Sequence, residues 1–562
     1  MGGYVPRIAV VGGGMSGVVL GKELAARGLH ATVFDTGEHA CGGRASTREV
    51  TTEDGVTHSF DHSTQYFTAT PGSRFEAMAE DWCEQGLVTC WPAGLVGTLE
   101  SDSAGSFVPF DDDARRFIGV KGLRPLCDFL AEGASEVVRP QWVGAMTPVG
   151  GDGAKRRWEL ASGPGGKRLG TFDFVAIAHN GKCAARLAGT AKHPDGRPAA
   201  AKVNRSLQCA FGIQPTPALA KQRKLILSSV WALMLVTEAP VDAARAFEGA
   251  HITGSDVISW ASNVTAKRRH GQKSHGAASA STGGGLNGNG GGGGEAWVIH
   301  STPQFARDNK CPQEAIPAGK AAFVTAAMKS AFEAALGLPA GAIKTSHTRV
   351  QLWGAANPLT AAGVPAVFDS ATRTGACGDW CQGPPSVEAA SLSALALADA
   401  IEALFHPDRA KHPRAAADLD AASVRWSPCG GSSLGAFPGT QVPSMAEVPA
   451  SPRREAGGGG RRGGDGSRRG GRGRTNRSAS PNARGGGRGA RGGRGGRGGR
   501  GGRRSDVAVA AMESLTVGHR GRDPFATRGS GRVQGGALGG GRGGAGWGGV
   551  TRIAGGAAAR VV

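Results

Sequence analysis

No apolar run in the chain is long enough to cross a membrane. A membrane-spanning helix needs about 20 consecutive apolar residues, whereas the best candidate, residues 225–236, is shorter and contains serines. A secretory signal is also missing, and an apolar strand pattern begins by Ile8, which leaves no room for a transit peptide. We therefore expect no membrane span and a cytoplasmic location, with a plastid as the alternative if the N-terminus is truncated.

Cysteine pairs of the kind that bind metals or form disulfide frameworks are absent too. The ten cysteines are scattered and none forms a C-x-x-C pair. The nearest neighbours, Cys377 and Cys381, have no histidine cluster beside them. Metal sites and disulfide scaffolds need such clusters at short spacing. The pattern predicts reduced, mostly buried thiols and no metal site.

Acidic residues are scarce only at the C-terminal end. Residues 451–562 hold 24 lysines and arginines against 5 acidic residues, whereas residues 1–450 hold 41 and 40. The net charge of +20 therefore belongs to the end of the chain, and the remainder is a nearly neutral body. Arg-Gly-Gly repeats cannot form a core, so we predict a disordered tail over 451–562 behind a linker at 407–450.

The composition of this tail is typical of RNA-associated segments, in which arginines contact phosphates and stack on bases. Aromatic residues are nearly absent, however, since only Phe525 and Trp547 occur in it. RNA binding through the tail and low complexity without a function therefore both stay open.

A glycine motif opens the body. Residues 8–11 form an apolar strand pattern, Gly12, Gly14 and Gly17 then fit G-x-G-x-x-G, and a second strand ends on Asp35. In a dinucleotide site the first glycine permits a tight turn, the second lets the backbone approach a pyrophosphate, and the third lets the helix pack closely. The acidic residue accepts hydrogen bonds from a ribose. The motif predicts a dinucleotide site, with NAD and FAD both open.

Two later features favour FAD, the longer cofactor. Gly42, Gly43 and Arg44 follow the acid-bearing strand, and Gly378-Asp379 precedes the last helix of the body. Asp379 could bond a hydroxyl of the ribitol, and the helix behind it could direct its N-terminus at the flavin, where negative charge gathers on reduction. An ordinary turn and helix cap would explain Gly378-Asp379 equally well.

The patterning of the body predicts an α/β fold with a Rossmann domain interleaved with an α+β substrate domain on an antiparallel sheet. Short buried strands alternate with helices up to about residue 200 and again near the end, and longer β-rich segments start at Val203. We assign residues 1–70, 115–200 and 346–406 to the FAD-binding domain, and residues 71–114 and 201–345 to the substrate domain. A Ser/Gly/Asn run at 270–294 is expected to be a disordered insertion.

Several motifs carry a family resemblance: residues 12–17, 42–44, 60–68 (FDHSTQYFT), 117–120 (FIGV), 231–234 (WALM), 377–381 (CGDWC) and 387–390 (VEAA). With them the chain resembles the renalase-like branch of FAD-dependent amine oxidases, within the glutathione-reductase-type flavoproteins. Residues 179–183 and 350–356 are similar to those of plant and algal FAD/NAD(P)-binding oxidoreductases. The resemblance runs from about Arg7 to Leu404 and leaves out the tail.

The resemblance implies FAD as the cofactor and assigns residues to it. Gly12, Gly14 and Gly17 would hold the pyrophosphate, and Arg44 would lie on the pyrophosphate side. Met15, Ser16, Gly42 and Gly43 would also belong to the cofactor site. Asp35 would bind the adenosine ribose, and the Val143 backbone, on a strand expected over 141–146, would pair with adenine. Around the ribitol and flavin would lie Gln65, Tyr66, Gly378, Asp379, Val387, Glu388 and Ala389. Ser63 stands where relatives often have Gly.

The catalytic step is less visible in the sequence. Hydride transfer to flavin can depend on positioning alone, so a base need not exist, and no lysine near the flavin can be assigned. Trp297, Trp353, Trp380 and His300 would line a substrate cavity or belong to the core. We predict an FAD-dependent oxidoreductase of amine-oxidase type that acts on a small molecule. An RNA-associated protein with a redox-sensing flavin fold and a flavin-dependent desaturase remain the alternatives.

Overall fold

The structure, a computed structural model, describes residues 4–101, 105–151, 153–274, 294–412, 415, 419 and 423–429, and the backbone of 551–554. The Arg-Gly-Gly repeats, and with them the predicted RNA contacts, lie outside the described residues. So does the Ser/Gly/Asn run beyond residue 274.

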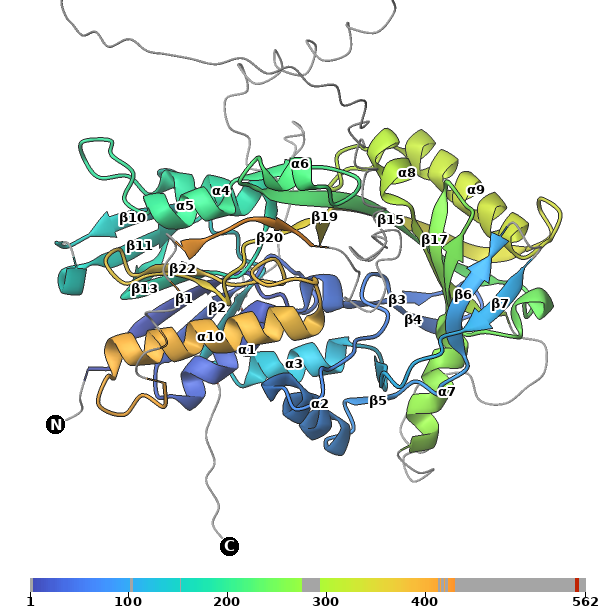
Figure 1. Cartoon of the computed structure of the whole chain (residues 1–562), viewed down its shortest axis with the longest axis horizontal. Coiled ribbons are helices and arrows are strands. Elements are labelled where there is room, and N and C mark those ends of the chain that lie inside the picture. The colour runs from blue at the N-terminus through green and yellow to red at the C-terminus, as the bar shows by residue number, and fades with distance from the viewer. Residues whose placement is uncertain are drawn as a thin grey trace, which may run out of the picture. The chain divides into compact units, whose positions relative to one another are not determined.

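A seven-stranded, mainly parallel sheet organises one part of the body (Figure 1). Its order is β21 (Val367–Asp369), β22 (Thr374–Ala376), β13 (Phe174–Ile177), β1 (Arg7–Val11), β2 (His30–Phe34), β9 (Glu136–Arg139) and β24 (Thr551–Ala554). The strands from β22 to β9 are parallel, and β21 and β24 are antiparallel at the two edges. The glycine motif follows β1, as the sequence predicts.

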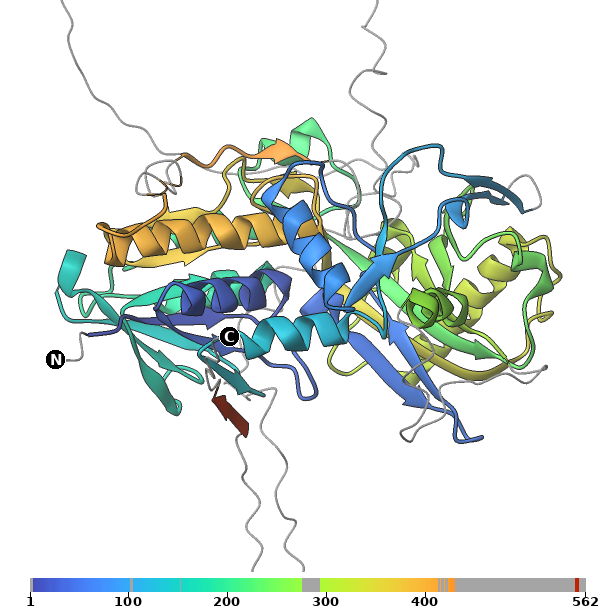
Figure 2. The same ribbon diagram turned by 90° about the horizontal axis from the view of Figure 1, so that it is seen from below.

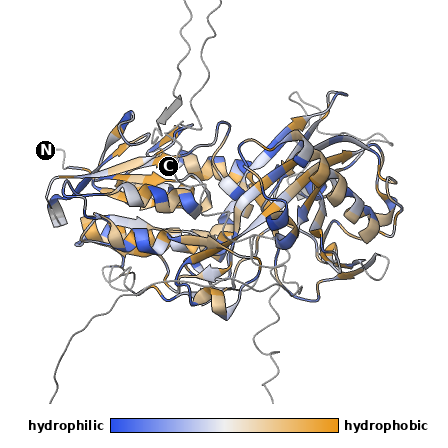
Figure 3. Cartoon of the chain, turned by 90° about the horizontal axis from the view of Figure 1, so that it is seen from above, coloured by the Kyte–Doolittle hydropathy of each residue, from blue (hydrophilic) through white to orange (hydrophobic). Residues whose placement is uncertain are grey.

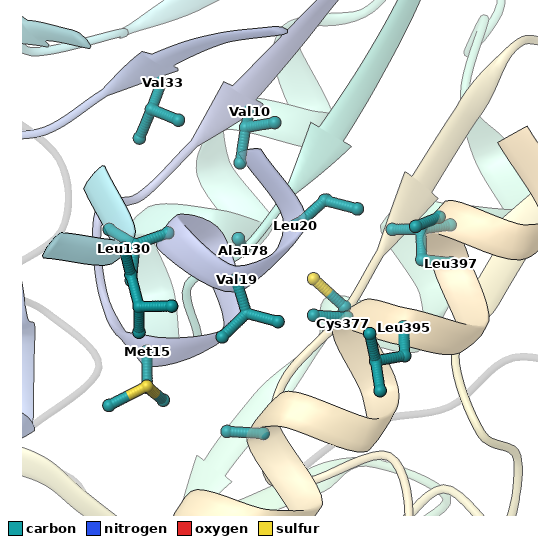
Figure 4. Packing of buried hydrophobic residues seen from close by; sticks show 14 of the residues in the cluster. Val10, Met15, Val19, Leu20, Val33, Leu130, Ala178, Cys377, Leu395 and Leu397 are labelled. Atoms are coloured by element: carbon teal, nitrogen blue, oxygen red, sulfur yellow. The ribbon is translucent and has the colours of Figure 1, made fainter. Parts of the chain in front are cut away.

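Helices cover both faces of this sheet, because alternate residues of each strand point to opposite sides. Ile8 and Val10 meet α1 (Met15–Ala26), α3 (Arg124–Glu132) and α10 (Val387–Phe405), whereas Ala9 and Val11 meet α4 (Gly181–Thr190) and α5 (Ala201–Leu207). Helices α1 and α10 run side by side (Figure 2). Leu20 of α1 and Leu397 of α10 belong to the apolar cluster that joins them (Figure 4). The predicted α/β fold is confirmed.

A second, mainly antiparallel sheet forms the other part of the body. Its strands are β14 (Cys209–Phe211), β15 (Leu225–Thr237), β18 (Ala296–Ser301), β17 (Ile258–Asn263), β16 (Gly249–Thr253), β6 (Val96–Glu100), β7 (Ser106–Pro109) and β19 (Thr345–Pro358). Helix α9 (Ala318–Ala335) packs on one face and α8 (Pro303–Asp308) lies against β15. The hairpin of β3 (Thr47–Thr51) and β4 (Thr57–Asp61), together with α7 (Val264–Ser274), packs on the opposite face.

Smaller elements connect and extend these parts. They are α2 (Arg74–Glu84), α6 (Pro217–Ala220), β5 (Val88–Cys90), β8 (Phe117–Gly119), β10 (Ala145–Val149), β11 (Arg157–Ala161), β12 (Arg168–Phe172), β20 (Thr360–Ala361), β23 (Ser427–Pro428), and the short 3-10 turns Gly43–Ala45, Gly153–Lys155 and Asp242–Ala244. None of the described helices has the length and apolar character needed to cross a membrane.

Several expected boundaries differ from the structure. The strand expected over 141–146 begins at Ala145, which leaves Val143 in the preceding loop. Val203 lies in helix α5, because the β-rich region starts only at Cys209. Residues 270–274, expected in the disordered insertion, continue helix α7. The Gly- and Ser-rich residues that follow made the end of this helix hard to predict from the sequence.

The described body also extends into segments assigned to other parts. The apolar face of α2, in the predicted substrate domain, packs into the core that surrounds α1. In the predicted linker, Trp426 stacks on Trp380 with ring centroids 6.1 Å apart, and β23 pairs with β20. In the predicted tail, Thr551–Ala554 form β24 beside β9 (Figure 2, dark red). The domain division therefore stays a proposal.

Candidate functional site

The glycine turn, residues 12–17, is shaped by two positions that exclude a side chain. Gly12 has a φ of +112°, a conformation that other residues rarely adopt, and an added Cβ would lie 3.0 Å from the Ala178 carbonyl oxygen. At Gly17 an added Cβ would lie 1.8 Å from the Gly12 carbonyl oxygen. These glycines thus let α1 begin directly against the end of β1.

Gly14 has the opposite surroundings. An added Cβ there would meet no atom within 4 Å, so this side of the turn is open. Gly14 caps helix α1 without a side chain, and the amides of Met15 and Ser16 have no hydrogen-bond partner among the described residues. Free amides at a helix start carry partial positive charge and attract anions such as phosphates. The turn is therefore open where a pyrophosphate would approach.

Asp35 closes the turn from the end of β2. Its carboxylate accepts hydrogen bonds from the backbone amides of Gly13, Thr36 and Gly37, and burial raises its pKa. The next segment starts with a 2.6 Å hydrogen bond from the Gln141 amide to the Asp35 carbonyl. Val143 follows in that loop, buried, with its amide unpaired among the described residues.

The second glycine element, residues 42–44, lies directly against the glycine turn. The Gly42 amide donates to the Gly13 carbonyl at 2.7 Å, and Gly42 and Gly43 have φ values of +125° and +55°. An added Cβ on Gly43 would lie 3.3 Å from the Gly14 Cα. Two motifs that the sequence separates by a helix and a strand therefore meet.

Arg44 connects this element to the far end of the body. Its guanidinium donates two hydrogen bonds to the Asp379 carboxylate, at 2.8 and 2.9 Å, and a third to the Ala356 carbonyl. The Asp379 side chain is 1% exposed and that of Arg44 is 20% exposed. Such a bidentate pair fixes the geometry of both side chains. The sequence assigned these two residues to different parts of the cofactor, whereas the structure joins them.

The start of α10 is held mainly by contacts within the protein. Ser386 caps it by accepting from the Ala389 amide at 2.8 Å, and the Glu388 carboxylate accepts from the amide and hydroxyl of Thr70. The Val387 side chain is fully buried in the core. Gly378 donates to the Ser393 hydroxyl at 3.1 Å, and an added Cβ there would lie 2.6 Å from the Trp380 indole nitrogen.

Cys377 completes the contact between the two ends of the body. Its thiol forms a hydrogen bond with the Ser16 hydroxyl in the first turn of α1. Burial raises the pKa of this thiol well above its ordinary value. Figure 4 shows the Cys377 side chain between α1 and α10. The glycine turn, the second glycine element and residues 377–379 thus form one continuous site.

Gln65 and Tyr66 lie beside this site with their side chains engaged. The Gln65 amide donates to the carbonyls of Asp61 and Ser63 and accepts from the Ser262 hydroxyl at 2.7 Å. Tyr66 is 7% exposed, and its ring packs against Trp91 and Trp260 at about 6 Å. The Gln65 side chain is therefore tied to the protein at both ends of its amide group.

Buried polar atoms without partners lie next to Arg44. The hydroxyls of Ser63 and Thr64 and both amide atoms of Asn357 have no hydrogen bond with any described residue, although all three side chains are at most 2% exposed. The Thr64 amide donates to the Arg44 carbonyl, and Asn357 follows Ala356 on β19. Unsatisfied buried groups cost about 1–3 kcal/mol each, so this pattern fits a site that a polar ligand completes.

A buried ion cluster that no sequence motif predicts lies next to Gln65. Lys267 of α7 is 0% exposed, lies 3.2 Å from the Asp61 carboxylate, and donates to the Gln65 carbonyl at 3.0 Å. Arg268 bonds the same carboxylate at 2.8 Å. We call Asp61, Lys267 and Arg268 the ion cluster.

Burial and charge act against each other in the ion cluster. Burial lowers the pKa of Lys267 to about 8, although Asp61 opposes the change. For Asp61, burial favours the neutral acid, but Arg268 and Lys267 outweigh burial and hold the pKa well below its ordinary value. Lys267 is thus an ammonium group that can release its proton at mildly alkaline pH, near the predicted flavin residues.

The sequence could have suggested Lys267 only weakly. It opens a basic run, Lys267-Arg268-Arg269-His270, in front of a Gly/Ser-rich segment, and such a run usually marks an exposed surface. Its spacing of three residues from the buried Val264 is the one local hint that it shares the inner face of a helix.

The other candidates for a substrate cavity come from different elements of the fold. Trp297 and His300 are buried in β18, Trp380 stacks on Trp426, and Trp353 lies next to the site. The Trp353 ring packs on His62 at 5.3 Å, and its indole donates to the His62 carbonyl at 3.4 Å. Trp353 therefore contacts the segment that precedes Ser63.

Comparison with known proteins supports the nucleotide-binding part. A family model described as an NAD(P)-binding Rossmann-like domain matches residues 10–82, which include the glycine turn, Asp35 and the second glycine element. A search of curated proteins by sequence finds no match.

Solved structures with a similar arrangement are distant in sequence. An oxidoreductase from Methanosarcina mazei is 11% identical, with a TM-score of 0.45, and the match covers 70% of this chain and 99% of that chain. A reduced UDP-galactopyranose mutase is 10% identical, with a TM-score of 0.44 and coverage of 73% and 98%. A putrescine oxidase with bound putrescine is 11% identical, with a TM-score of 0.43 and coverage of 71% and 99%.

Proposed function

We propose that this protein is an FAD-dependent oxidoreductase of amine-oxidase type. The observation that carries the proposal is the meeting of three sequence-distant elements, residues 12–17, 42–44 and 377–379, around Arg44. A site confined to the first βαβ unit would suit a dinucleotide held at one end. A site that continues through Arg44 to the start of α10 suits a longer, extended cofactor.

The residues present fit FAD. Gly14 with the free amides of Met15 and Ser16 would hold the pyrophosphate, and Asp35 the adenosine ribose. Val143 offers a backbone amide that no described residue pairs with, in the loop that follows Asp35. The flavin end would lie beyond the Arg44–Asp379 pair, near the unpaired hydroxyls of Ser63 and Thr64. When bound, FAD supplies the group that accepts a hydride.

The surrounding residues would handle substrate and protons. The ion cluster holds its charge away from water, because the Asp61 and Lys267 side chains are fully buried. The Lys267 ammonium, bonded to the Gln65 carbonyl, would keep the loop from Ser63 to Tyr66 in one position and would hold an exchangeable proton there. We propose an amine or a reduced nicotinamide-like donor as the substrate, since both release a hydride. A desaturase acting on a polyene or tetrapyrrole is the alternative.

The proposal is tested with the purified full-length chain. We expect visible flavin absorption, release of FAD on denaturation, and bleaching of the flavin by an amine or by NADH without air. A colourless protein that takes up no FAD would contradict the proposal. A colourless protein that binds NADH would show instead that the site holds a nicotinamide cofactor.

The Gly14→Ala variant tests whether the glycine turn belongs to the FAD site. An added Cβ at Gly14 meets no protein atom, so the variant should fold normally but lose most of its FAD, because the methyl group would stand where the pyrophosphate approaches. Gly189→Ala is the matched control, since its Cβ also meets nothing within 4 Å and the residue lies in α4. Equal FAD content in the two variants would contradict the assignment of the glycine turn to the FAD site.

A further inference from the structure

Polar side chains lie between the β3–β4 hairpin and β19, and Figure 3 shows hydrophilic residues among the apolar ones in the strands of the second sheet. Arg48 of β3 donates a hydrogen bond to the side-chain oxygen of Gln351 on β19, at 3.2 Å. Arg48 is opposite Phe60 in register, and Phe60 packs with Met234 of β15. Arg349 of β19 is opposite Met234. Because residues directly opposite each other share a face of a sheet, both arginines lie on the surfaces that the hairpin and β19 turn towards each other.

No acidic side chain among the described residues balances these two arginines. The bond to Gln351 is the one hydrogen bond that the Arg48 side chain makes with a described residue, and its Nε is buried without a partner there. Burial and then the charge of Arg349 lower the pKa of Arg48. The Asp61 carboxylate, on the neighbouring strand, is already occupied within the ion cluster. Arg48 is thus a half-buried cation with a like charge nearby and no described counterion.

His62 connects these arginines to the predicted flavin residues. It is 2% exposed, and burial and then the charge of Arg48 lower its pKa to about 4. The ring is therefore neutral at neutral pH, and its Nδ1 has no partner among the described residues. His62 packs on Trp353 and directly precedes Ser63 and Thr64, whose hydroxyls also lack described partners. Polar atoms without partners thus continue from Arg48 to the place proposed for the flavin.

The surroundings of Arg48 favour a ligand with one negative charge. A cation that is partly removed from water without a counterion is costly, so an anion at this place is stabilised. The planar guanidinium of arginine matches the two oxygens of a carboxylate. Arg349 is exposed, so water and salt screen its charge, and one negative charge is enough to balance the site. A carboxylate therefore fits better than a phosphate, which carries about two charges at neutral pH.

We propose that Arg48 and Arg349 form an anion site for a carboxylate of the substrate, so that the hydride donor is an amine that also carries an acid group. This inference rests on the proposed function, because it takes the flavin to lie near Ser63 and Thr64. The carboxylate would accept hydrogen bonds from the Arg48 guanidinium, and the exposed Arg349 would attract it from solution. A neutral amine would leave the charge of Arg48 unbalanced and would bind more weakly.

The test uses the full-length chain and three amino acids of increasing length: γ-aminobutyrate, δ-aminopentanoate and ε-aminohexanoate. Isothermal titration calorimetry compares each acid with its primary amide, which keeps the amine and loses the negative charge. We expect at least one acid to bind roughly tenfold more tightly than its amide, with an advantage that shrinks in added salt. Inorganic phosphate should bind more weakly than this acid. Equal binding of all acids and their amides, or phosphate binding as tight as that of the best acid, would overturn the carboxylate site.

Arg48→Gln should abolish the roughly tenfold advantage of the acid over its amide, because it removes the half-buried charge. Arg349→Gln should reduce the advantage only about threefold, since this charge is exposed, and it serves as the second variant if Arg48→Gln does not fold. Arg168→Gln is the matched control, because Arg168 is an exposed arginine of β12 whose charge is balanced by Glu159. Far-UV circular dichroism and FAD content show whether the variants fold alike. An unchanged advantage in folded Arg48→Gln, or in Arg349→Gln, would contradict the anion site.

Flavin bleaching without air separates this inference from the proposed function, because calorimetry needs no flavin. In the native chain the best acid should bleach the flavin at lower concentration than its amide, and in Arg48→Gln the two should be equal. A flavin-containing native chain that both compounds bleach equally would overturn the anion site alone. A colourless chain that still prefers the acid would contradict the proposed function but support the anion site.

Discussion

Two aspartates, one in each part of the body, have opposite electrostatic surroundings: Asp35 is half-buried and Asp61 is fully buried. Asp35, directly after β2 in the parallel sheet, accepts from backbone amides and from the Cys41 thiol but faces no cation, and burial raises its pKa. Asp61, at the end of β4 beside the second sheet, faces Lys267 and Arg268, and its pKa falls despite complete burial. The first carboxylate completes a backbone turn, whereas the second neutralises two cations inside the protein. The first is thus tolerant of losing its charge, and the second is not.

The largest effect is expected when Asp61 loses its charge. Asp61→Asn would leave Lys267 and Arg268 without their carboxylate, and breaking a buried pair on one side costs about 3–5 kcal/mol. Asp128→Asn is the control, because Asp128 pairs with Arg124 on a partly exposed helix surface and should change stability by no more than about 0.5 kcal/mol. Urea unfolding of the two variants measures the difference. A loss below 1 kcal/mol for Asp61→Asn would show that water reaches the ion cluster.

This contrast also explains what the sequence could and could not predict. The glycine turn, Asp35 and the second glycine element are determined by backbone geometry, since positions such as Gly12 and Gly42 need conformations that few residues allow. Their roles can therefore be predicted from short motifs. The ion cluster depends on how α7 packs against β4, two elements about 200 residues apart, and no local pattern encodes that contact.

The same reasoning applies to the Arg44–Asp379 pair. Each residue lies in a recognisable motif, so both were predicted at the site, but their bond spans 335 positions and was not foreseen. The segment at 423–429 was assigned to a linker for its composition, yet Trp426 packs on Trp380. Composition is an average over a stretch of residues, so it cannot predict that a single large side chain packs against the folded body.

The second expected effect concerns pH and Lys267. Because the folded pKa of about 8 lies below the ordinary value of 10.5, the unfolded chain binds this proton more tightly between these values. Unfolding then takes up a proton, and this group makes stability rise with pH in that window, by at most about 1.4 kcal/mol per pH unit. Below pH 8 both states hold the proton and the contribution is flat.

Lys267→Met should remove that part of the pH dependence. We expect the difference in unfolding free energy between mildly and strongly alkaline solution to shrink in this variant but not in Lys121→Met, which alters an exposed lysine. Denaturant unfolding at several alkaline pH values measures both. Parallel curves for the native chain and Lys267→Met would mean that Lys267 keeps an ordinary pKa in the folded protein.

A smaller effect is expected where the folded body ends. Trp426→Ala removes the ring that stacks on Trp380, and an aromatic pair is worth about 0.5–1.5 kcal/mol beyond its buried area. The loss of stability should therefore be about 1 kcal/mol or somewhat more, measured by denaturant unfolding. Phe323→Ala provides the control, because Phe323 is 54% exposed on α9 and should change little. Equal stability of the native chain and Trp426→Ala would show that residues 423–429 add nothing to the folded body and belong to the linker.

The smallest effect on stability is expected at Asp35, and its sign should be opposite to that at Asp61. Because burial raises the pKa of Asp35, the folded state holds this proton more tightly than the unfolded state, so the contribution of Asp35 to stability falls as the pH rises through that window.

Asp35→Asn removes this charge, and its side-chain oxygen still accepts from Thr36. We expect stability at neutral pH to stay within about 1 kcal/mol of the native value or to rise slightly, while FAD binding weakens because the amide is a poorer acceptor for the ribose. Unfolding and FAD titration of the same variant separate the two effects. A large loss of stability in Asp35→Asn would show that both aspartates serve the fold as charges, and the contrast between the two sheets would not hold.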